Sequence, residues 1–388
     1  MNKPSERLRV EHIITGLKTG GAEMMLLKLL SAAGRNWEPE VISLSEEGLV
    51  GPRIRALGIP VRALGMKRIS LSPKSVLNLL RWTRSFEPEL IQGWMYHGNL
   101  MASLAAIAAR RRVPVLWNIR QTLYDLARER RATALVIRTG ALLSRLPAAI
   151  IYNSHTSAKQ HEDFGYMPQK RVVIPNGFDC NFFRPDADAR KHIRQELGIN
   201  EDAILIGLIG RYHPMKDHRG FLRAAGQVLR ACPNVRFLLA GNGVVHEDAV
   251  LAKAIAEEGL LGRLCMLGER CDTERLNSAL DIACSASAWG EGFSNSIGEA
   301  MACGVPCVVT DIGDSALIVG DTGRTVTASN SDALARAVIE LIRAGSEHRR
   351  NLGAAARRRV EAEFSLASVT RRYDELYHSM VRPAALKG

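Results

Sequence analysis

Two glutamates, Glu291 and Glu299, stand eight positions apart in the stretch 291-EGFSNSIGEAMACGVP-306. Residues Ser294 to Ser296 between them suit the start of a helix, because short polar side chains can satisfy its first N–H groups. The first turn of such a helix favours anions. Carboxylates on either side of the anion can accept hydrogen bonds from sugar hydroxyls. The stretch therefore predicts a site for an elongated ligand with the order ribose, diphosphate, sugar.

Two cations stand in a second segment, 210-GRYHPMKD-217, which follows the apolar run 203–209. Arg211 and Lys216 lie five residues apart in this predicted loop. A guanidinium and an ammonium beside two phosphates can neutralise a departing diphosphate without a metal ion. A pair of ordinary surface cations is the alternative interpretation of this segment when it is considered alone.

A third segment, 16-GLKTGGAEMML-26, follows the predicted strand 8–15 and leads into a helical pattern over 22–34. Gly20 and Gly21 leave room for a ligand at the start of that helix, although a glycine pair in this position is usually only a turn. Because three such segments follow predicted strands, we favour a binding site over three unrelated loops.

The framework that must hold these segments alternates strand and helix patterns along the whole chain. This alternation predicts parallel sheets covered by helices on both faces, and hence an α/β fold with two doubly wound, Rossmann-like domains. The predicted strands are 8–15, 40–45, 90–94, 114–119, 149–154, 171–175, 203–210, 235–241, 264–268, 281–287 and 306–311. The predicted helices include 22–34, 98–110, 220–232, 248–260, 273–280, 294–304 and 366–380.

The loop signals after residue 175 mark a domain junction. We expect an N-terminal domain over 1–178, a C-terminal domain over 179–365, and a final segment, 366–388, whose helix crosses back to pack on the first domain.

The net charge of +12 is distributed unevenly. Residues 1–190 contain 28 Lys and Arg against 16 Asp and Glu, whereas residues 191–388 contain 24 of each class. Residues 53–145 alone contain 17 basic and 4 acidic residues, including 110-RRR-112 and 128-RERR-131. Any single arginine is best explained as solvated surface. The one-sided cluster favours an anionic partner, either a membrane surface or a phosphate-bearing acceptor.

Several classes of protein are disfavoured by what the sequence lacks. Nucleic-acid binding ranks last among the anionic partners, because there is neither zinc-finger spacing nor an aromatic-rich platform nor a clear recognition helix. The G-x-G-x-x-G pattern of nicotinamide dehydrogenases and the G-x-x-x-x-G-K-[ST] pattern of P-loop proteins are both absent. The richest apolar run, 132–151, is broken by Arg138, Arg145 and Pro147, so we expect no transmembrane span.

The cysteine content and the amino-terminal segment indicate a cytoplasmic protein. Seven cysteines are scattered along the chain without a CxxC motif, as is usual for reduced, buried side chains. The basic amino-terminal residues lead into a predicted strand and lack a signal-peptide core, so we expect no export. The basic cluster adds the hypothesis of peripheral contact with the cytoplasmic face of the membrane.

The segments 20-GGAE-23, 175-PNGFD-179, 210-GRYHPMK-216 and 291-EGFSNSIGEAMACGVP-306 together resemble the retaining GT-B glycosyltransferases of family 4, the glycosyl transferases group 1. The resemblance covers nearly the whole chain, and the glutamate pair followed by EAMACG-x-P is its most specific element. It implies a GT-B fold, in which two Rossmann-like domains face a central cleft. The N-terminal domain would bind an acceptor, and the C-terminal domain would bind a nucleotide-diphospho-sugar donor.

The resemblance also implies roles for individual residues of this chain. Glu299 would bind the ribose hydroxyls, and Glu291 would bind hydroxyls of the transferred sugar. The implied catalytic set is Glu291, Arg211, Lys216 and His97, with Arg211 and Lys216 holding the diphosphate. The other implied donor contacts are Gly20 and Gly21 from the opposite domain, Gly292, and the backbone amides of Phe293, Ser294, Asn295 and Ser296. Arg270, in the loop after the predicted strand 264–268, is a candidate contact to the base.

This chain departs from the family pattern at one position. Many members carry a histidine at the end of the strand that corresponds to 115-VLWN-118, whereas this chain continues with 117-WNIRQT-122. Asn118 or Arg120 is therefore the candidate for that acceptor-side position. His97, at the start of a predicted helix, is the better candidate to contact the donor sugar or the acceptor, and a structural role for this histidine is the alternative.

The resulting prediction is a retaining glycosyltransferase that needs no metal or other cofactor. The donor would be a UDP-sugar as first choice and a GDP-sugar as second, and the acceptor a hydroxyl of a lipid-linked saccharide in cell-surface polysaccharide synthesis. The departing phosphate would take the acceptor proton, with Glu291 as nucleophile the less favoured mechanism. The triplet 186-DAD-188 is predicted to be a loop with a helix cap rather than a metal site. A nucleotide-sugar epimerase and a non-catalytic nucleotide-sugar binding protein remain the alternatives.

Overall fold

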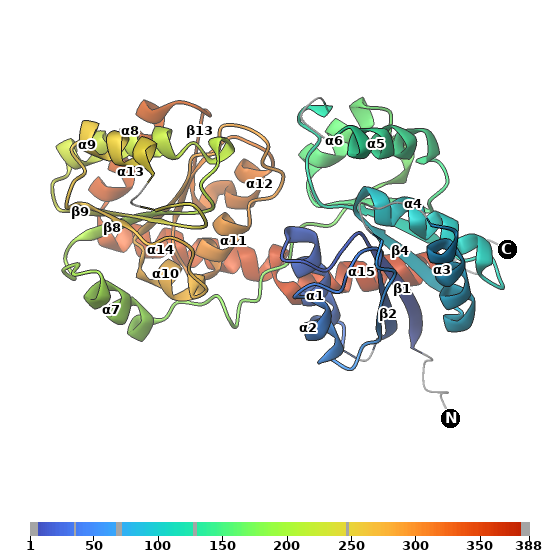
Figure 1. Cartoon of the computed structure of the whole chain (residues 1–388). Helices are drawn as coiled ribbons and strands as arrows, with labels where there is room; N and C mark the ends of the chain where they lie inside the picture. The colour runs from blue at the N-terminus through green and yellow to red at the C-terminus, as the bar shows by residue number, and fades with distance from the viewer. Residues whose placement is uncertain (1–6, 35, 67–71, 127–129, 246–247, 382–388) are drawn as a thin grey trace. The chain divides into compact units, whose positions relative to one another are not determined.

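The computed structural model describes residues 7–34, 36–66, 72–126, 130–245 and 248–381. The chain divides into two compact units. The N-terminal unit comprises residues 1–177 and 366–388, and the C-terminal unit comprises residues 178–365. Each unit contains a parallel sheet with helices on both faces, which confirms the predicted pair of doubly wound domains (Figure 1). Arg128 and Glu129 of the predicted basic cluster lie outside the described residues.

The sheet of the N-terminal unit has the strand order β3-β2-β1-β4-β5-β6-β7, and every described pairing is parallel. Its strands are β1 (Leu8–Ile14), β2 (Trp37–Ser43), β3 (Val61–Ala63), β4 (Leu90–Trp94), β5 (Val115–Ile119), β6 (Ala149–Tyr152) and β7 (Arg171–Val173). The order reverses between β1 and β4. Sheets of this kind bind ligands at such a reversal, beyond the carboxyl ends of the strands.

Two apolar cores cover the two faces of this sheet. One core joins the sheet to α1 and α15, and the other joins it to α3, α4, α5 and α6. The helices of the unit are α1 (Gly21–Ala32), α2 (Gly51–Arg55), α3 (Pro73–Phe86), α4 (Met95–Ala105), the 3-10 turn η2 (Ala106–Ala108), α5 (Arg131–Leu143), α6 (His155–Asp163), the 3-10 turn η4 (Pro168–Lys170) and α15 (Leu366–Val381).

The last helix, α15, belongs to the N-terminal unit, where it packs beside α1 (red in Figure 1). Trp37 Nε1 donates a hydrogen bond to Asp374 Oδ1 at 2.8 Å, and Tyr377 donates through its hydroxyl to Gln92 Oε1 at 2.6 Å. The rings of Trp37 and Tyr377 also lie 4.8 Å apart. These contacts fix α15 against strands β2 and β4, whose contacting residues lie 337 and 285 positions earlier in the chain.

The C-terminal unit repeats the same strand order, β10-β9-β8-β11-β12-β13, again with parallel pairing. Its strands are β8 (Ile204–Ile209), β9 (Val235–Ala240), β10 (Leu264–Met266), β11 (Ile282–Ser285), β12 (Cys307–Thr310) and β13 (Arg324–Val326). Its helices are α7 (Ala187–Glu196), η5 (Pro214–Lys216), α8 (His218–Ala231), α9 (Ala249–Glu257), α10 (Thr273–Ala279), α11 (Asn295–Ala302), α12 (Ser315–Val319), η6 (Gly320–Thr322), α13 (Ser331–Arg343), α14 (Gly345–Arg359) and the π-helical turn η7 (Val360–Phe364). Here the order reverses between β8 and β11.

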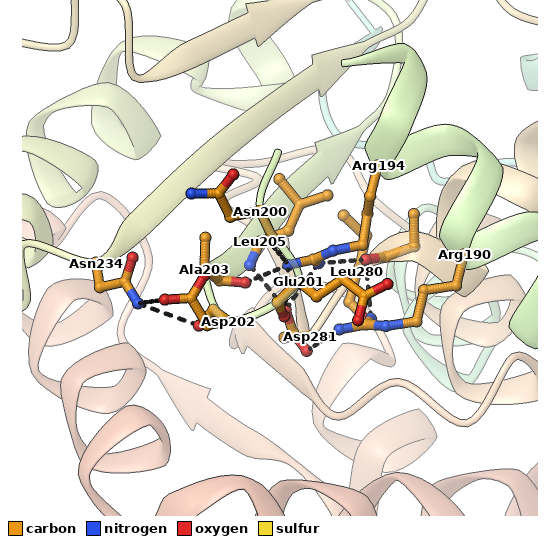
Figure 2. A network of polar contacts seen from close by, with 11 residues as sticks. Arg190, Arg194, Asn200, Glu201, Asp202, Ala203, Leu205, Asn234, Leu280 and Asp281 are labelled. Carbon is orange, nitrogen blue, oxygen red and sulfur yellow. Dashed lines mark hydrogen bonds and ion pairs between the residues drawn. The ribbon is translucent and has the colours of Figure 1, made fainter. Parts of the chain in front are cut away.

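A polar network holds the amino ends of β8 and β11 together (Figure 2). Arg194 of α7 is 2% exposed, donates to the carbonyl of Ala279 at 3.2 Å and lies 3.3 Å from Asp281 Oδ2. Asp281 also pairs with Arg190 at 2.8 Å and accepts a hydrogen bond from Leu205 N at 2.8 Å. Since Leu205 lies in β8 and Asp281 directly precedes β11, this network sets the spacing of two strands whose far ends carry the candidate site.

Among the described residues, the structure contains no helix with both the length and the apolar character needed to cross a bilayer.

Candidate functional site

The loops that follow β8 and β11 meet at the reversal point of the C-terminal sheet. Ala288 N donates a hydrogen bond to Met215 O at 2.8 Å, which joins the two loops through their backbones. The rings of His213 and Trp289 lie 5.9 Å apart with an interplanar angle of 65°. The cation segment and the glutamate segment, singled out separately in the sequence, therefore form one site.

An ion pair lies at the centre of this junction. Lys216 Nζ is 2.5 Å from Glu291 Oε2, and Ser287 Oγ donates a hydrogen bond to the same oxygen at 3.0 Å. The side chains of Lys216 and Glu291 are only 15% and 11% exposed, so water screens this pair less than an ordinary surface pair. The ammonium thus balances the carboxylate for which the resemblance implies contacts with hydroxyls of the transferred sugar.

Helix α11 starts beside this pair, at Asn295, with Ser294 as the residue before the first turn. The Ser294 side chain makes no capping hydrogen bond to the helix, and its Oγ lies 3.3 Å from Ser296 Oγ. The N–H groups of a first turn have no partner within their own helix, and they carry the positive end of the helix dipole. Glu299 lies about 6 Å further along the axis, by the rise of an α-helix. The helix start agrees with the predicted start at 294, and the placing of Glu291 and Glu299 about an anion stays a prediction.

Arg211 directly follows the loop residue Gly210 after β8, and its side chain is exposed. Within the described part of the chain, Arg211 makes no ion pair, so its guanidinium is available to an anion. His213 Nδ1 accepts a hydrogen bond from Met215 N at 3.2 Å. Burial, together with the charges of Arg211 and Lys216, lowers the pKa of His213 and keeps its ring neutral. His213 was not among the predicted site residues, although it lies between the two predicted cations.

Gly313 packs against the glutamate loop, and it was not among the predicted site residues. Its φ is +63°, and a Cβ at this position would lie 2.3 Å from the carbonyl oxygen of Glu291. Asp314 N donates a hydrogen bond to Gly292 O at 2.9 Å. Only a glycine can combine this backbone conformation with so close an approach. The contact between Gly313 and the glutamate loop arises only on folding, so the sequence around Gly313 does not indicate it.

Arg270, the candidate contact to a base, is held by carboxylates. Its Nε and Nη2 atoms donate to the two oxygens of Asp272 at 2.8 and 2.7 Å, and its Nη1 atom donates to Glu196 at 2.7 Å. These partners raise the pKa of Arg270 above its ordinary value. A contact between Arg270 and a base remains a prediction. The guanidinium would have to bind the base while it is also paired with Asp272 and Glu196.

In the N-terminal unit, His97 lies at the reversal point between β1 and β4. It is the third residue of α4, which begins directly after β4. A Cβ on the next residue, Gly98, would lie 2.6 Å from the carbonyl oxygen of Ile13 in β1, so the start of α4 packs closely on that strand. His97 is half-buried, and burial lowers its pKa, which favours the neutral imidazole.

Gly20 and Gly21 lie at the start of α1, beyond the end of β1. A Cβ on Gly20 would lie 2.4 Å from Glu23 Oε2, whereas nothing lies within 4 Å of such an atom on Gly21. Partial burial raises the pKa of Glu23. The start of α1 is therefore already covered on one side by a carboxylate of its own first turn, a feature that the glycine pair did not reveal.

Asn118 and Arg120 lie in a buried network inside the N-terminal unit. Asn118 Nδ2 and Arg120 Nη1 both donate to the hydroxyl of Tyr373, at 2.9 and 3.1 Å. Arg120 also donates to Ile174 O at 3.0 Å and to Asn176. These contacts connect β5 to α15. They give both side chains a structural role, and an acceptor contact by either one stays a prediction.

Two groups of residues that could suggest a metal site have other roles in the structure. Asp186 precedes α7 and accepts a hydrogen bond from Ala189 N at 2.8 Å, which confirms that it is a helix cap. Cys303 follows the last residue of α11 and Cys307 begins β12, and both side chains are buried. No group of three or more His, Cys, Asp and Glu side chains is positioned to hold a metal ion within the described residues.

Comparisons with known proteins agree with the two-unit organisation. Residues 189–359 match the family described as glycosyl transferases group 1, and residues 19–182 match glycosyltransferase family 4. The chain is 27% identical over 248 residues to the lipopolysaccharide core biosynthesis mannosyltransferase LpsB of Rhizobium meliloti (strain 1021), which covers 62% of this chain and 68% of LpsB.

Two further proteins add to this similarity. The chain is 28% identical over 178 residues to the UDP-Gal:alpha-D-GlcNAc-diphosphoundecaprenol alpha-1,3-galactosyltransferase of Escherichia coli, which covers 45% of this chain and 46% of that protein. The crystal structure of Anabaena HepE in complex with UDP superposes with a TM-score of 0.82 at 23% identity, covering 96% of this chain and 100% of HepE. At 23% identity, the similarity to HepE is evidence for the fold alone.

Proposed function

The chain belongs to the glycosyl transferases group 1, with the GT-B fold, and from this premise we propose that it transfers a sugar from a nucleotide-diphospho-sugar to a hydroxyl of an acceptor. The observation that carries the proposal is the Lys216–Glu291 pair at the start of α11. It brings a cation for the diphosphate and a carboxylate for the sugar into one place. UDP-sugars are the first choice of donor and GDP-sugars the second, supported by the UDP named in the HepE complex.

Loss of the nucleoside diphosphate would be the step that the site promotes. When the anomeric C–O bond breaks, negative charge develops on the β-phosphate, where Arg211, Lys216 and the first-turn amides of α11 would stabilise it. Removing one such donor typically costs about 100- to 1,000-fold in rate. Because these groups supply positive charge from the protein itself, we propose that the reaction proceeds without a metal ion. Activity that is unchanged by a chelator and by added Mg²⁺ would agree with this.

We propose retention of the anomeric configuration. The departing phosphate oxygen would accept the proton of the attacking hydroxyl on the same face of the sugar. Glu291 is occupied by Lys216 and Ser287, which favours a role in positioning over one as nucleophile. The anomeric configuration of the product, measured by NMR from an α-linked donor, tests this. A β-linked product would contradict retention.

The acceptor that fits the chain best is a lipid-linked saccharide of cell-surface polysaccharide synthesis, used at the cytoplasmic face of the membrane. The excess positive charge of the first half of the chain supports this, as does the Escherichia coli relative, whose name includes a diphosphoundecaprenol-linked sugar. All seven cysteines are free, as is common in a reducing compartment.

A thermal-shift screen across UDP, GDP and their sugars tests the donor assignment. A ligand at about one hundred times its Kd raises the melting temperature of a domain of this size by roughly 5–10 °C. We expect UDP compounds to produce the largest shift. Release of nucleoside diphosphate only when acceptor is present would distinguish a transferase from an epimerase or a binding protein. If no nucleotide or nucleotide-sugar raises the melting temperature, the proposed donor class is wrong.

A further inference from the structure

Helix α5 in the N-terminal unit has an apolar outer face that no other described residue of this unit covers. Leu135 is 65% exposed, Leu142 is 76% exposed and Leu146, just after the helix, is 61% exposed. By helical geometry, Leu135 and Leu142 point within about 20° of each other. The buried residues of the helix, Ile137 and Gly140, lie on the opposite side, which packs toward α4 and the sheet (Figure 1). The leucines therefore form a stripe that faces away from the core.

Three arginines lie along the flank of this stripe. Arg131, Arg138 and Arg145 follow one another at intervals of seven residues, and all three are exposed. Within the described residues, none of the three forms an ion pair. At this spacing, each arginine lies about 40–80° round the helix from the leucine stripe. The outer face is thus a strip of apolar side chains bordered on one side by cations.

The stability of α5 does not account for the arginines on its outer face and at its amino end. Arg130 and Arg131 stand at the amino end of α5, where the helix dipole disfavours cations, and Arg130 provides no side-chain cap. No Asp or Glu occurs in the sequence between Arg130 and His161, so no acidic side chain of this segment offsets the arginines. An external anionic partner would account for both features.

We infer that the outer face of α5 docks on an anionic lipid bilayer. An amphipathic helix lies in the plane of a bilayer when its apolar side chains enter the acyl boundary and its basic side chains reach the headgroups. The leucine stripe supplies the first element, and Arg131, Arg138 and Arg145 supply the second, with their long side chains bending toward the lipid phosphates. The biological purpose of this contact rests on the proposed function, because a lipid-linked acceptor would be anchored in the bilayer on which α5 docks. The contact itself needs neither donor nor acceptor.

Vesicle sedimentation of the full chain tests the inference. The probes are vesicles of phosphatidylcholine alone and vesicles with about 30% phosphatidylglycerol. We expect the chain to partition at least about tenfold more strongly onto the anionic vesicles. Leu135→Gln/Leu142→Gln should lower this partitioning by about tenfold or more, because inserted apolar surface is lost. Arg131→Ser/Arg138→Ser should lower it by roughly 25-fold, because each basic side chain near an anionic surface contributes about fivefold.

Matched variants in the C-terminal unit serve as controls. Leu261→Gln removes a leucine that is 71% exposed, and Arg336→Ser/Arg343→Ser removes two exposed arginines that are seven residues apart on α13. Both should bind vesicles as the unaltered chain does, and all variants should keep their melting temperature and their UDP-induced thermal shift.

Three results would overturn the inference. The first is equal binding to neutral and anionic vesicles, and the second is full binding by the leucine variant. The third is no binding to either kind of vesicle. If the chain then proves to be a dimer that the α5 variants dissociate, the outer face of α5 is an interface with a second copy of the chain. A UDP-induced shift without vesicle binding would leave the proposed function intact, and vesicle binding without such a shift would remove the donor assignment alone.

Discussion

Lys216 and Glu291 are 75 residues apart in the chain, yet Lys216 Nζ lies 2.5 Å from Glu291 Oε2. The two residues come from loops after adjacent strands, β8 and β11, at the point where the strand order of the sheet reverses. The pair thereby brings a cation and a carboxylate together shortly before α11 begins. In the proposed function, substrate binding would separate them, with Lys216 turning to the diphosphate and Glu291 to the sugar.

The first prediction separates these two roles. Lys216→Ala should weaken UDP binding and lower kcat/KM by about 100- to 1,000-fold, because charge on the leaving group loses a partner. Glu291→Gln should lower kcat/KM by about 100-fold or more, yet bind UDP at least as tightly, since a negative charge near the diphosphate is removed. Calorimetry with UDP and steady-state kinetics measure both. Lys253→Ala, which breaks the exposed pair with Glu257, is the control and should change neither. Weaker UDP binding by Glu291→Gln would contradict the assignment.

The second prediction concerns Glu299 and the ribose. Glu299→Gln should weaken UDP binding by roughly tenfold to 100-fold, because a carboxylate accepts hydrogen bonds from hydroxyls more strongly than an amide does. Binding of inorganic pyrophosphate, which has no ribose, should stay the same. The comparison of the two affinities is the measurement. An equal loss for both ligands would mean that Glu299 supports the helix and does not contact the ribose.

The third prediction uses two glycines with similar backbone angles. Gly313 has φ +63° and Gly262 has φ +70°, so alanine strains either position by about 1 kcal/mol. At Gly313 the new Cβ would also meet the Glu291 carbonyl at 2.3 Å, whereas nothing lies within 4 Å at Gly262. Gly313→Ala should therefore lower kcat by about tenfold or more, and Gly262→Ala should not. Similar kinetics for both variants would contradict a positioning role for Gly313.

The fourth prediction concerns pH and a buried carboxyl group in β1. Burial is the main cause that raises the pKa of Glu11 to about 8. The hydrogen bond from Thr83 Oγ1 at 2.8 Å lowers this pKa, and the charge of the nearby Glu40 raises it. Between about pH 4.5 and 8, the folded chain keeps a proton that the unfolded chain has lost, so the free energy of unfolding falls as pH rises through this interval. Glu11→Gln should flatten this dependence and should be more stable than the unaltered chain above pH 8.

Tryptophan fluorescence in urea measures this stability, since four of the five tryptophans, Trp37, Trp82, Trp94 and Trp117, lie in the N-terminal unit. Glu363→Gln in the C-terminal unit is the control and should leave the pH dependence unchanged. A wild-type chain whose N-terminal unit is equally stable at pH 6 and pH 9 would show that Glu11 is not protonated as described.

The fifth prediction concerns Tyr373, whose hydroxyl accepts from both Asn118 and Arg120. Tyr373→Phe should lower the free energy of unfolding of the N-terminal unit by about 1–3 kcal/mol, since two buried donors lose their acceptor. UDP affinity should be unaffected, because the proposed donor site lies in the C-terminal unit. The same urea measurement tests this. If Tyr373→Phe leaves the stability unchanged but lowers the transfer rate, Asn118 and Arg120 contact the acceptor and do not act mainly through the fold.

Much of the fold could be predicted because strand and helix patterns alternate strongly. Two strands of three residues, β3 and β13, were missed because so short a segment carries little periodic signal, whereas the equally short β7 and β10 lie within the predicted strands 171–175 and 264–268. Helix α5 was noted only as an apolar run broken by arginines, which is the pattern of a helix that exposes leucines instead of burying them.

The start of α11 could be predicted because its signals are contiguous in sequence, whereas contacts between distant segments could not. The α11 start and its glutamates lie in one stretch of sequence. In contrast, the support of the loop by Gly313, the carboxylate partners of Arg270 and the Tyr373 network arise from residues brought together only by folding. No local pattern could reveal these contacts.

A crystal structure with UDP bound tests the proposed donor site most directly. We expect the diphosphate at the first-turn amides of α11, with Lys216 moved from Glu291 to a phosphate oxygen and the ribose hydroxyls on Glu299. UDP bound elsewhere would contradict it, for instance in the pocket of about 550 Å³ lined by Arg190, Asp281 and Arg349 at the opposite end of the sheet. So would a complex in which the Lys216–Glu291 pair stays closed and Glu299 turns away from the nucleotide.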